Sequence, residues 1–129
     1  MMNNKPDILI TLTTGKQDRG SRATLAFSWG CAALAMGKSV SIYLSMDGTV
    51  WAVKGAMKGV EVGGFEPIDD YLEQFVALGG EILVCAPCTE YYCAFDRDSI
   101  KGTLIDEANL TGLATIVSKM GNNTKSLTF

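Results

Sequence analysis

The pair Cys85 and Cys88 is the feature of this sequence with the clearest chemical potential. Only two residues, Ala86 and Pro87, separate these cysteines, and no other CxxC pattern occurs in the chain. A thiolate in such a pair can attack a sulfur donor, hold a persulfide or be oxidised reversibly. Pro87 removes one backbone donor and stiffens the turn between the two sulfur atoms. We therefore predict Cys85 and Cys88 as catalytic residues, with Cys88 as the resolving or supporting thiol.

The sequence of 129 residues contains no histidine. This excludes Ser-His-Asp and Cys-His catalysis and every histidine-ligated metal within a single chain. A lowered thiol pKa would have to come from a helix N-terminus, from a cation such as Lys16 or Arg19, or from another subunit. Such a thiol suits a carrier that receives and passes on sulfur better than a fast hydrolytic enzyme.

The four cysteines also allow other interpretations. Free cysteines are often small buried hydrophobic residues, and Cys31, inside an apolar helical segment, fits that description. Cys93 is open to either interpretation. With Cys85 and Cys88 it gives the spacing C-x2-C-x4-C, which lacks the second CxxC of a zinc ribbon and departs from the plant-type ferredoxin order. A metal or cluster is an alternative chiefly where subunits share ligands; we predict no metal and no cofactor.

The elements around the CxxC pattern predict an α/β fold. Short apolar segments alternate with longer helical patterns, which is typical of parallel strands joined by crossover helices. We predict one domain over residues 1–129, with a five-stranded, mostly parallel sheet, helices on both faces and a flavodoxin-like type. Strands are expected at residues 7–13, 39–45, 81–85, 103–105 and 125–129. Helices are expected at residues 21–36, 50–57, 68–76 and 110–117, with Ser21 and Asn109 as N-caps and Pro67 at a first helical position.

The first predicted helix is apolar nearly all round. One stripe consists of Leu25, Trp29, Ala32, Ala33 and Met36, and a second consists of Ala23, Phe27, Gly30, Cys31 and Leu34. A domain of this size usually leaves one face of a helix in water, so we infer that another subunit covers the second stripe. The prediction is a homo-oligomer, in which loops of adjacent subunits can complete one site.

Three predicted loops meet at the carboxyl ends of the strands, where open parallel sheets bind their ligands. They are residues 14–20, 46–49 and 86–93, and the third carries the CxxC pattern. The first two supply a polar set that could hold a small anion or nucleotide, although it matches no phosphate-loop motif. A solvated polar loop is an equally good interpretation. The candidate ligand-binding residues are Thr14, Gly15, Lys16, Arg19, Asp47 and Gly48.

The chain resembles the DsrE/DsrF-like family, which includes sulfur-relay subunits of the TusD type. The resemblance covers nearly the whole chain and is carried by residues 8–36, 40–48 and, most specifically, 80–88. It implies a five-stranded α/β fold assembled as trimers or hexamers. It also implies a persulfide on the cysteine after the third strand, which is Cys85 here, with Cys88 at the place of a second family cysteine. Many members end the short helix with Arg-Gly, where this chain has Tyr92-Cys93.

Composition narrows the functional classes further. The net charge of -3 argues against a nucleic-acid partner, and no segment approaches the roughly 20 apolar residues of a membrane span. No signal segment is recognisable, so we predict a cytoplasmic protein whose cysteines are thiols. The favoured function is a sulfur carrier or thiol-redox protein with donor and acceptor proteins as partners; whether it turns over as an enzyme stays open. The alternatives are an oligomeric binding module for a small anion or nucleotide, and a structural subunit.

Overall fold

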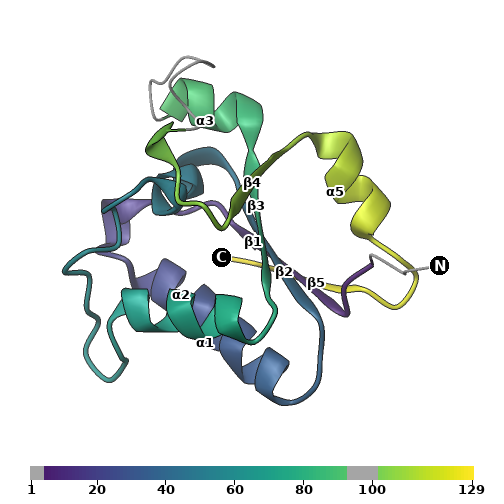
Figure 1. The fold of residues 1–129 in the computed structure, drawn as a ribbon, viewed down its shortest axis with the longest axis horizontal. Coiled ribbons are helices and arrows are strands. Elements are labelled where there is room, and N and C mark those ends of the chain that lie inside the picture. Colours follow the sequence, from purple (N-terminus) through teal and green to yellow (C-terminus); the bar gives the residue numbers. More distant parts are fainter. Residues whose placement is uncertain (1–4, 93–101) are drawn as a thin grey trace.

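Five parallel strands form one sheet at the centre of the protein (Figure 1). The computed structural model describes residues 5–92 and 102–129. Each neighbouring pair in the sheet runs parallel, in the order β4-β3-β2-β1-β5. The predicted α/β class and five-stranded sheet are confirmed, whereas the order differs from the 2-1-3-4-5 order of flavodoxin itself. The strands are β1 (Ile8–Leu12), β2 (Val40–Leu44), β3 (Glu81–Cys85), β4 (Ala108–Thr111) and β5 (Lys125–Thr128).

Helices cover the two faces of the sheet unequally. Figure 1 shows α1 (Ser21–Ala35) and α2 (Ile68–Ala77) on one face and α5 (Leu113–Lys119) on the other. The steps from β1 to β2 and from β2 to β3 move in one direction along the sheet, and the step from β4 to β5 reverses it. Because parallel crossovers are right-handed, a reversal of direction places the connecting helix on the opposite face.

This unequal cover divides the interior into two cores. The larger core lies under α1 and α2 and takes one face of the central strands, including Ile10, Ile42 and Val84. The smaller core lies under α5 and consists of Leu9, Tyr43, Leu83, Cys85 and Ile116, with Cys88 packed against it. The two predicted catalytic cysteines therefore belong to the thinner side of the molecule.

Phe75 occupies the centre of the larger core, between α1 and α2. Its ring packs edge-on against Phe27, with ring centroids 5.8 Å apart. A Cβ atom at Gly80 would stand 2.4 Å from the Phe75 ring, and one at Gly30 would stand 2.8 Å from it. Glycine at both positions lets the two helices and the sheet close around this ring.

The fourth strand and the helix after it are placed differently from the prediction. The predicted strand at residues 103–105 is wrong: β4 spans Ala108–Thr111, and Leu104 makes only an isolated antiparallel bridge to Val53. Asn109 consequently lies inside β4, and the N-cap of α5 is Gly112. The bridge explains the apolar pattern around Leu104, whereas an exposed edge strand such as β4 needs few apolar residues.

The N-terminal end of α1 is also built differently. Ser21 is the first helical residue, and the N-cap is Gly20, whose φ of 89° is left-handed. Asp18 takes the capping role predicted for Ser21. Its carboxylate accepts hydrogen bonds from the backbone N–H groups of Gly20 and Arg22, each at 3.0 Å. Asp18 and Arg22 form an ion pair as well. A side chain outside the helix thus satisfies donors that an N-cap residue usually satisfies.

Two smaller helix predictions need correction. The helix predicted at residues 50–57 is instead a 3₁₀ helix, η2 (Met46–Ala52), which starts four residues earlier. Pro67 is the N-cap of α2 and not its first helical residue, with a ψ of 143° that precedes helical geometry. Local patterns place helix ends only to within one or two residues, because the last turn depends on contacts with other elements.

The two apolar stripes of α1 have opposite environments. The second stripe, which includes Phe27 and Gly30, is buried in the chain's own core, so the inference that another subunit covers it is wrong. The first stripe is the open one: Trp29 is 45% exposed and Met36 81% exposed. The sequence pattern cannot tell which stripe faces the sheet, because both are equally apolar. The open stripe lines a shallow groove formed by Leu25, Ser28, Trp29, Ala32, Ala33 and Met36.

The packing around Phe75 gives a first prediction. We expect Gly80→Ala to lower the free energy of unfolding by about 1–3 kcal/mol, because the new methyl group overpacks a ring that cannot move. Urea denaturation followed by tryptophan fluorescence measures this. Gly63→Ala is the matched control, since nothing lies within 4 Å of its added Cβ, and its effect stays within about 0.5 kcal/mol. Equal midpoints for Gly80→Ala and the natural protein would contradict the packing argument.

Candidate functional site

The two cysteines of the CxxC pattern lie in direct contact. Cys85 is the last residue of β3, and Cys88 lies in the first turn of α3 (Ala86–Tyr92). The Cys85 thiol donates a hydrogen bond to the Cys88 sulfur at 2.7 Å, and the Cys88 backbone N–H donates to the Cys85 sulfur at 3.3 Å. Both cysteines are free. The strand-to-helix junction thus joins the two thiols into one chemical unit.

The two thiols have different protonation. Cys85 is 5% exposed, and burial, followed by the hydrogen bond to Cys88, raises the pKa of its thiol. Cys88 is only half-buried. Partial burial pushes its pKa up, but hydrogen bonds from Cys85, from the Met46 backbone and from Ser45 together bring the pKa of Cys88 below its ordinary value. Burial thus favours the neutral form of the Cys85 thiol, whereas the groups around Cys88 favour its thiolate more than an ordinary environment would.

The turn after β2 supplies donors to Cys88. The Ser45 hydroxyl lies 3.8 Å from the Cys88 sulfur. Met46 has a φ of 53°, in the left-handed region, which costs about 1–3 kcal/mol for a residue other than glycine. Gly48 holds this turn against the end of β1, since a Cβ there would meet the Leu12 carbonyl oxygen at 2.0 Å. The strained backbone of Met46 is thus fixed by packing and presents its N–H to the sulfur.

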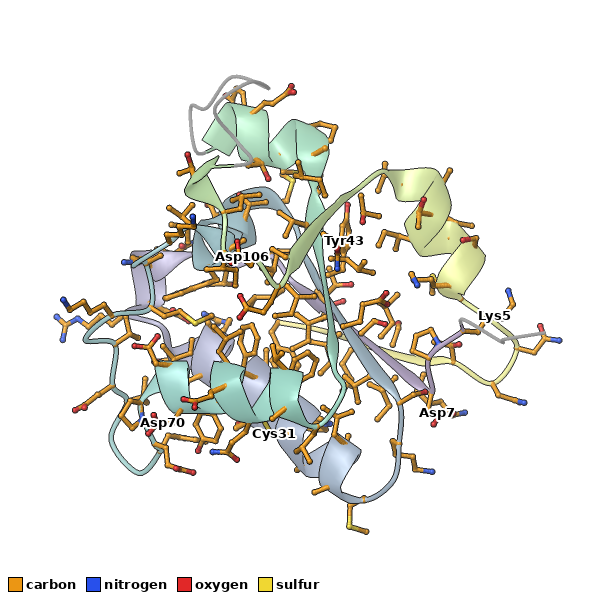
Figure 2. The ribbon with its side chains drawn as sticks, in the orientation of Figure 1. Lys5, Asp7, Cys31, Tyr43, Asp70 and Asp106 are labelled. Atoms are coloured by element: carbon orange, nitrogen blue, oxygen red, sulfur yellow. The ribbon has the colours of Figure 1, made fainter. Side chains whose placement is uncertain are left out.

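Tyr43 is a polar neighbour of this pair that the sequence analysis missed. It lies on β2, on the side of the sheet that faces α5 (Figure 2), and is 4% exposed. Its buried hydroxyl has no hydrogen-bond partner among the described residues. Burial, and after it the neighbouring Cys85, raises the pKa of Tyr43. The signal was present in the sequence, because Ser41 and Tyr43 of β2 and the extended Ser45 just after it stand two residues apart and so share one face.

The other predicted loops meet at the same edge, but their contacts are with each other. Gln17 donates to the Asp47 carboxylate at 3.3 Å, and a Cβ at Gly15 would stand 2.8 Å from the Asp47 carbonyl oxygen. The Trp51 indole N–H donates to the Thr14 carbonyl at 2.9 Å, and the Lys16 ammonium lies 5.7 Å from the Trp51 ring centroid.

Arg19 of the first loop is exposed and left-handed, with a φ of 62°. The hydrogen bonds that lower the pKa of Cys88 come from Cys85, Met46, Ser45 and its own backbone, so the proposed cations Lys16 and Arg19 do not account for that shift. A ligand-binding role for Thr14, Gly15, Lys16, Arg19, Asp47 and Gly48 stays a prediction.

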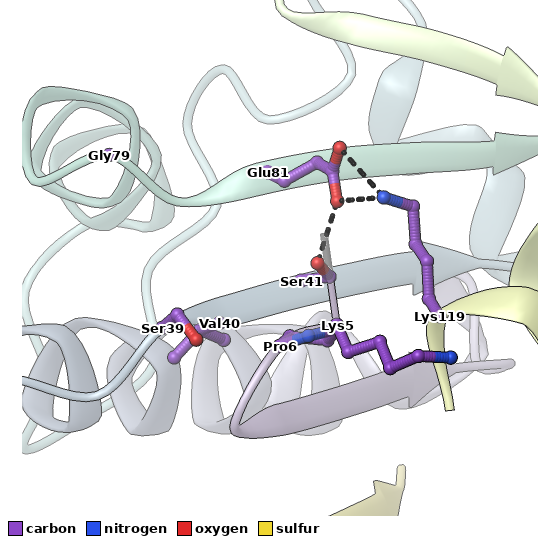
Figure 3. A pocket seen from close by; sticks show the side chains of 8 residues that line it. All are labelled: Lys5, Pro6, Ser39, Val40, Ser41, Gly79, Glu81 and Lys119. Atoms are coloured by element: carbon purple, nitrogen blue, oxygen red, sulfur yellow. Dashed lines mark hydrogen bonds and ion pairs between the residues drawn. The ribbon is translucent and has the colours of Figure 1, made fainter. Parts of the chain in front are cut away.

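A pocket at the opposite, amino-terminal ends of the strands has a structural explanation. Figure 3 shows the Glu81 carboxylate between Lys119, at 3.1 Å, and the Ser41 hydroxyl, at 2.7 Å. The nearby Lys5 ammonium donates to the Ser118 carbonyl at 2.9 Å. These polar groups satisfy one another, so the pocket ties α5 and the N-terminal segment to the sheet.

The remaining cysteines differ in what can be said of them. Cys31 is buried, as predicted, and its thiol donates to the Tyr71 carbonyl oxygen at 3.2 Å. Burial, followed by the charge of Glu66, raises the pKa of Cys31 to about 11. Cys93, the third cysteine of the C-x2-C-x4-C spacing, lies outside the described residues. Within residues 5–92 and 102–129, no three cysteine, histidine or carboxylate side chains gather into a possible metal site.

The sequence matches a known protein family over nearly its whole length. A profile of the DsrE/DsrF-like family matches residues 7–129 of the chain. The chain belongs to the DsrE/DsrF-like family. The match includes the three segments on which the resemblance was based, among them the end of β3 with Cys85. No functionally curated protein matches the sequence.

Solved structures support the DsrE-like fold. The ychN protein of E. coli is similar over 95% of this chain and 97% of its own, with a TM-score of 0.68 and 17% identity. A conserved protein of unknown function from Bacteroides thetaiotaomicron, BT1422, is similar over 95% of both chains, with a TM-score of 0.62 and 14% identity. At these identities the likeness concerns the fold alone. In the part of this DsrE-like chain that the structure describes, no helix is long and apolar enough to cross a bilayer.

The unequal thiols give a second prediction. With iodoacetamide, we expect the alkylation rate of Cys88 to reach half its maximum at a lower pH in the folded protein than in the urea-unfolded chain, because the fold lowers the pKa of Cys88. Cys31, with its pKa raised to about 11, stays unlabelled in the folded protein. Peptide mapping across a pH series measures both rates, and the urea-unfolded chain is the control. Labelling of Cys31 as fast as Cys88 would contradict the assignment.

Proposed function

We propose that this protein is a sulfur carrier or thiol-redox protein that works through Cys85 and Cys88. The observation that carries the proposal is the 2.7 Å hydrogen bond from a buried thiol to a half-exposed sulfur. The family resemblance noted from the sequence supports it, since it implies a persulfide at the position of Cys85. A cytoplasmic location, where thiols stay reduced, fits the same function.

The chemistry requires only a thiolate and a sulfane-sulfur donor. The thiolate attacks the terminal sulfur of a donor persulfide, R–S–SH. A new sulfur–sulfur bond forms on the protein, the donor's sulfur–sulfur bond breaks, and the donor leaves as a thiolate, R–S⁻. The protein then holds the persulfide Cys–S–SH until an acceptor thiolate attacks its outer sulfur. Donor and acceptor are thiol-bearing proteins or small thiols.

Sulfur uptake provides the third prediction. After incubation with limiting inorganic polysulfide, we expect the intact natural protein and Cys31→Ser to gain the mass of one sulfur atom, which dithiothreitol removes. A double variant, Cys85→Ser with Cys88→Ser, gains none, because both thiols of the CxxC pair are removed. Intact-protein mass spectrometry measures the adduct. Equal uptake by the double variant, or no uptake by the natural protein, would overturn the proposed function.

We also propose that the chain assembles as a homo-oligomer, a trimer or a hexamer. The open stripe of α1 supports this, because Trp29 and Met36 expose large apolar side chains along one groove. Burying such a groove against a second copy removes apolar surface from water.

The fourth prediction tests that assembly. We expect Trp29→Glu to shift the protein to monomers at micromolar concentration in light scattering, because a charge in the groove would have to be desolvated. Val117→Glu is the matched control: Val117 is also exposed and apolar but lies on α5. A natural protein that is already monomeric refutes the oligomer, and dissociation by Val117→Glu alone places the contact elsewhere than the groove.

A further inference from the structure

The proposed function does not say which sulfur of the pair takes up the transferred atom. Resting on that function, we infer that Cys88 is the sulfur that attacks the donor and carries the persulfide. Cys85 is its resolving partner, held as a neutral thiol until it displaces the transferred sulfur as sulfide. This assigns the two cysteines roles opposite to those expected from the resemblance, and it adds a route by which the protein discharges itself.

Access separates the two sulfurs. Cys85 ends a strand inside the smaller core and is 5% exposed, whereas Cys88 packs on the edge of that core and is half-buried. A donor persulfide carried by another molecule has to bring its outer sulfur into line with the attacking thiolate. Among the described residues, Cys88 is the more accessible member of the pair, so a donor reaches it with less opening of the smaller core.

Hydrogen bonding separates them as well. Cys85 is the donor and Cys88 the acceptor of their shared hydrogen bond. The Cys85 sulfur accepts one backbone N–H, that of Cys88, at 3.3 Å. The Met46 backbone and the Ser45 hydroxyl, 3.8 Å away, lie on the Cys88 side, where both lower the pKa of Cys88. A sulfur surrounded by donors is stabilised as an anion, and an anion is the nucleophile that sulfur transfer requires. The strained turn at Met46 holds this arrangement before any donor arrives.

The buried hydroxyl of Tyr43 belongs to the second step. It lies close to Cys85 and Ser45, and no described residue gives its oxygen a well-formed hydrogen bond in the resting pair. When Cys85 loses its proton, this hydroxyl can donate to the new thiolate, and such a hydrogen bond lowers the pKa of Cys85. Among residues 5–92 and 102–129, the other titratable group that acts on Cys85 is Cys88. The neighbours from β4 and α5 are Thr111 and Ile116, which do not titrate. Tyr43 is thus a positioning residue for discharge and has no part in uptake.

The discharge step balances without a further oxidant. The Cys85 thiolate attacks the Cys88 sulfur of the persulfide, a Cys85–Cys88 disulfide forms, and the bond to the transferred sulfur breaks. The transferred atom leaves as hydrosulfide, HS⁻, with the proton it already carries. The sulfane sulfur is reduced to sulfide while the two cysteine sulfurs are oxidised to the disulfide. A cellular dithiol then reduces that disulfide and restores the resting pair.

Burial of Cys85 controls how long the persulfide persists. Because burial raises the pKa of this thiol, only a small fraction is ionised at neutral pH, and discharge is slow. The ionised fraction increases tenfold for each pH unit below the pKa. The persulfide is therefore held at neutral pH and discharged faster as the pH increases.

The fifth prediction maps the sulfur. The protein is incubated with limiting inorganic polysulfide at neutral pH, alkylated and digested for peptide mapping. We expect the added sulfur on Cys88 both in the natural protein and in Cys85→Ser. Cys88→Ser should lose uptake at least tenfold. Sulfur found mainly on Cys85, or undiminished uptake by Cys88→Ser, overturns this inference while leaving the proposed function intact. No uptake on either cysteine of the natural protein overturns the proposed function itself.

Sulfide release tests the resolving role on the same samples. We expect release from the persulfidated natural protein to accelerate with pH, with a Cys85–Cys88 disulfide appearing in equal amount, and Cys85→Ser to release none. Tyr43→Phe should slow release roughly fivefold, as the loss of one hydrogen bond implies, without changing uptake. Tyr71→Phe is the matched control, since the hydroxyl of Tyr71 accepts from the Glu66 backbone away from the cysteines. Release from Cys85→Ser at the natural rate would refute the resolving role.

Discussion

Parallel pairing of β2 with β3 is the constraint on which the candidate site depends. The register sets Leu44 beside Val84, so both strands end at the same height of the sheet. The turn with Ser45 and Met46 therefore leaves the sheet where Cys85 gives way to α3, and α3 packs on η2. A shift of β3 by one residue along β2 would turn Cys85 to the face under α1 and α2, away from Tyr43. The chemistry of the sulfur pair thus depends on backbone hydrogen bonds that lie far from either sulfur.

The topology also decides how well each side of the sheet is shielded. Two crossovers in the same direction place α1 and α2 over one face and build a core around Phe27 and Phe75. A single seven-residue helix, α5, covers the other face, which carries more polar side chains, such as Ser41 and Tyr43. On that side the Cys85 thiol is buried, which favours its protonated form, while Cys88 next to it is only half-buried.

Much of this could be predicted from the sequence, because the informative signals were local. The order of apolar segments placed the CxxC pattern at the end of β3, and the dense pattern of Phe75 and its neighbours marked α2. Local patterns failed where the deciding contact comes from another element. The edge strand β4 lacks a strong apolar signal, and Asp18 caps α1 from outside the helix.

The protonation of the two cysteines is a further property that local sequence patterns could not predict, because contacts from other elements decide it. CxxC spacing alone does not distinguish the pKa values of the two thiols. The sources of activation expected from the sequence were a helix N-terminus, a cation such as Lys16 or Arg19, or another subunit. The difference arises because Cys85 is surrounded by the smaller core while Cys88 contacts donors from the turn after β2. Neither neighbourhood is visible in a linear pattern. Tyr43 was overlooked for a related reason, since a tyrosine in a strand is ordinarily a packing residue.

Because α5 covers its face of the sheet with few buried side chains, we expect local unfolding to begin at this helix. Proteins open in cooperative units of unequal stability, and a unit with few buried apolar contacts opens first. Only Ile116 of α5 is buried, whereas Leu113 and Val117 point to solvent. Transient unfolding of α5 would expose the Cys85 sulfur to solvent while the larger core stays intact. Amide exchange in α5 would then precede exchange in β1 and β2, and the inner thiol would become reachable through local fluctuation without global unfolding.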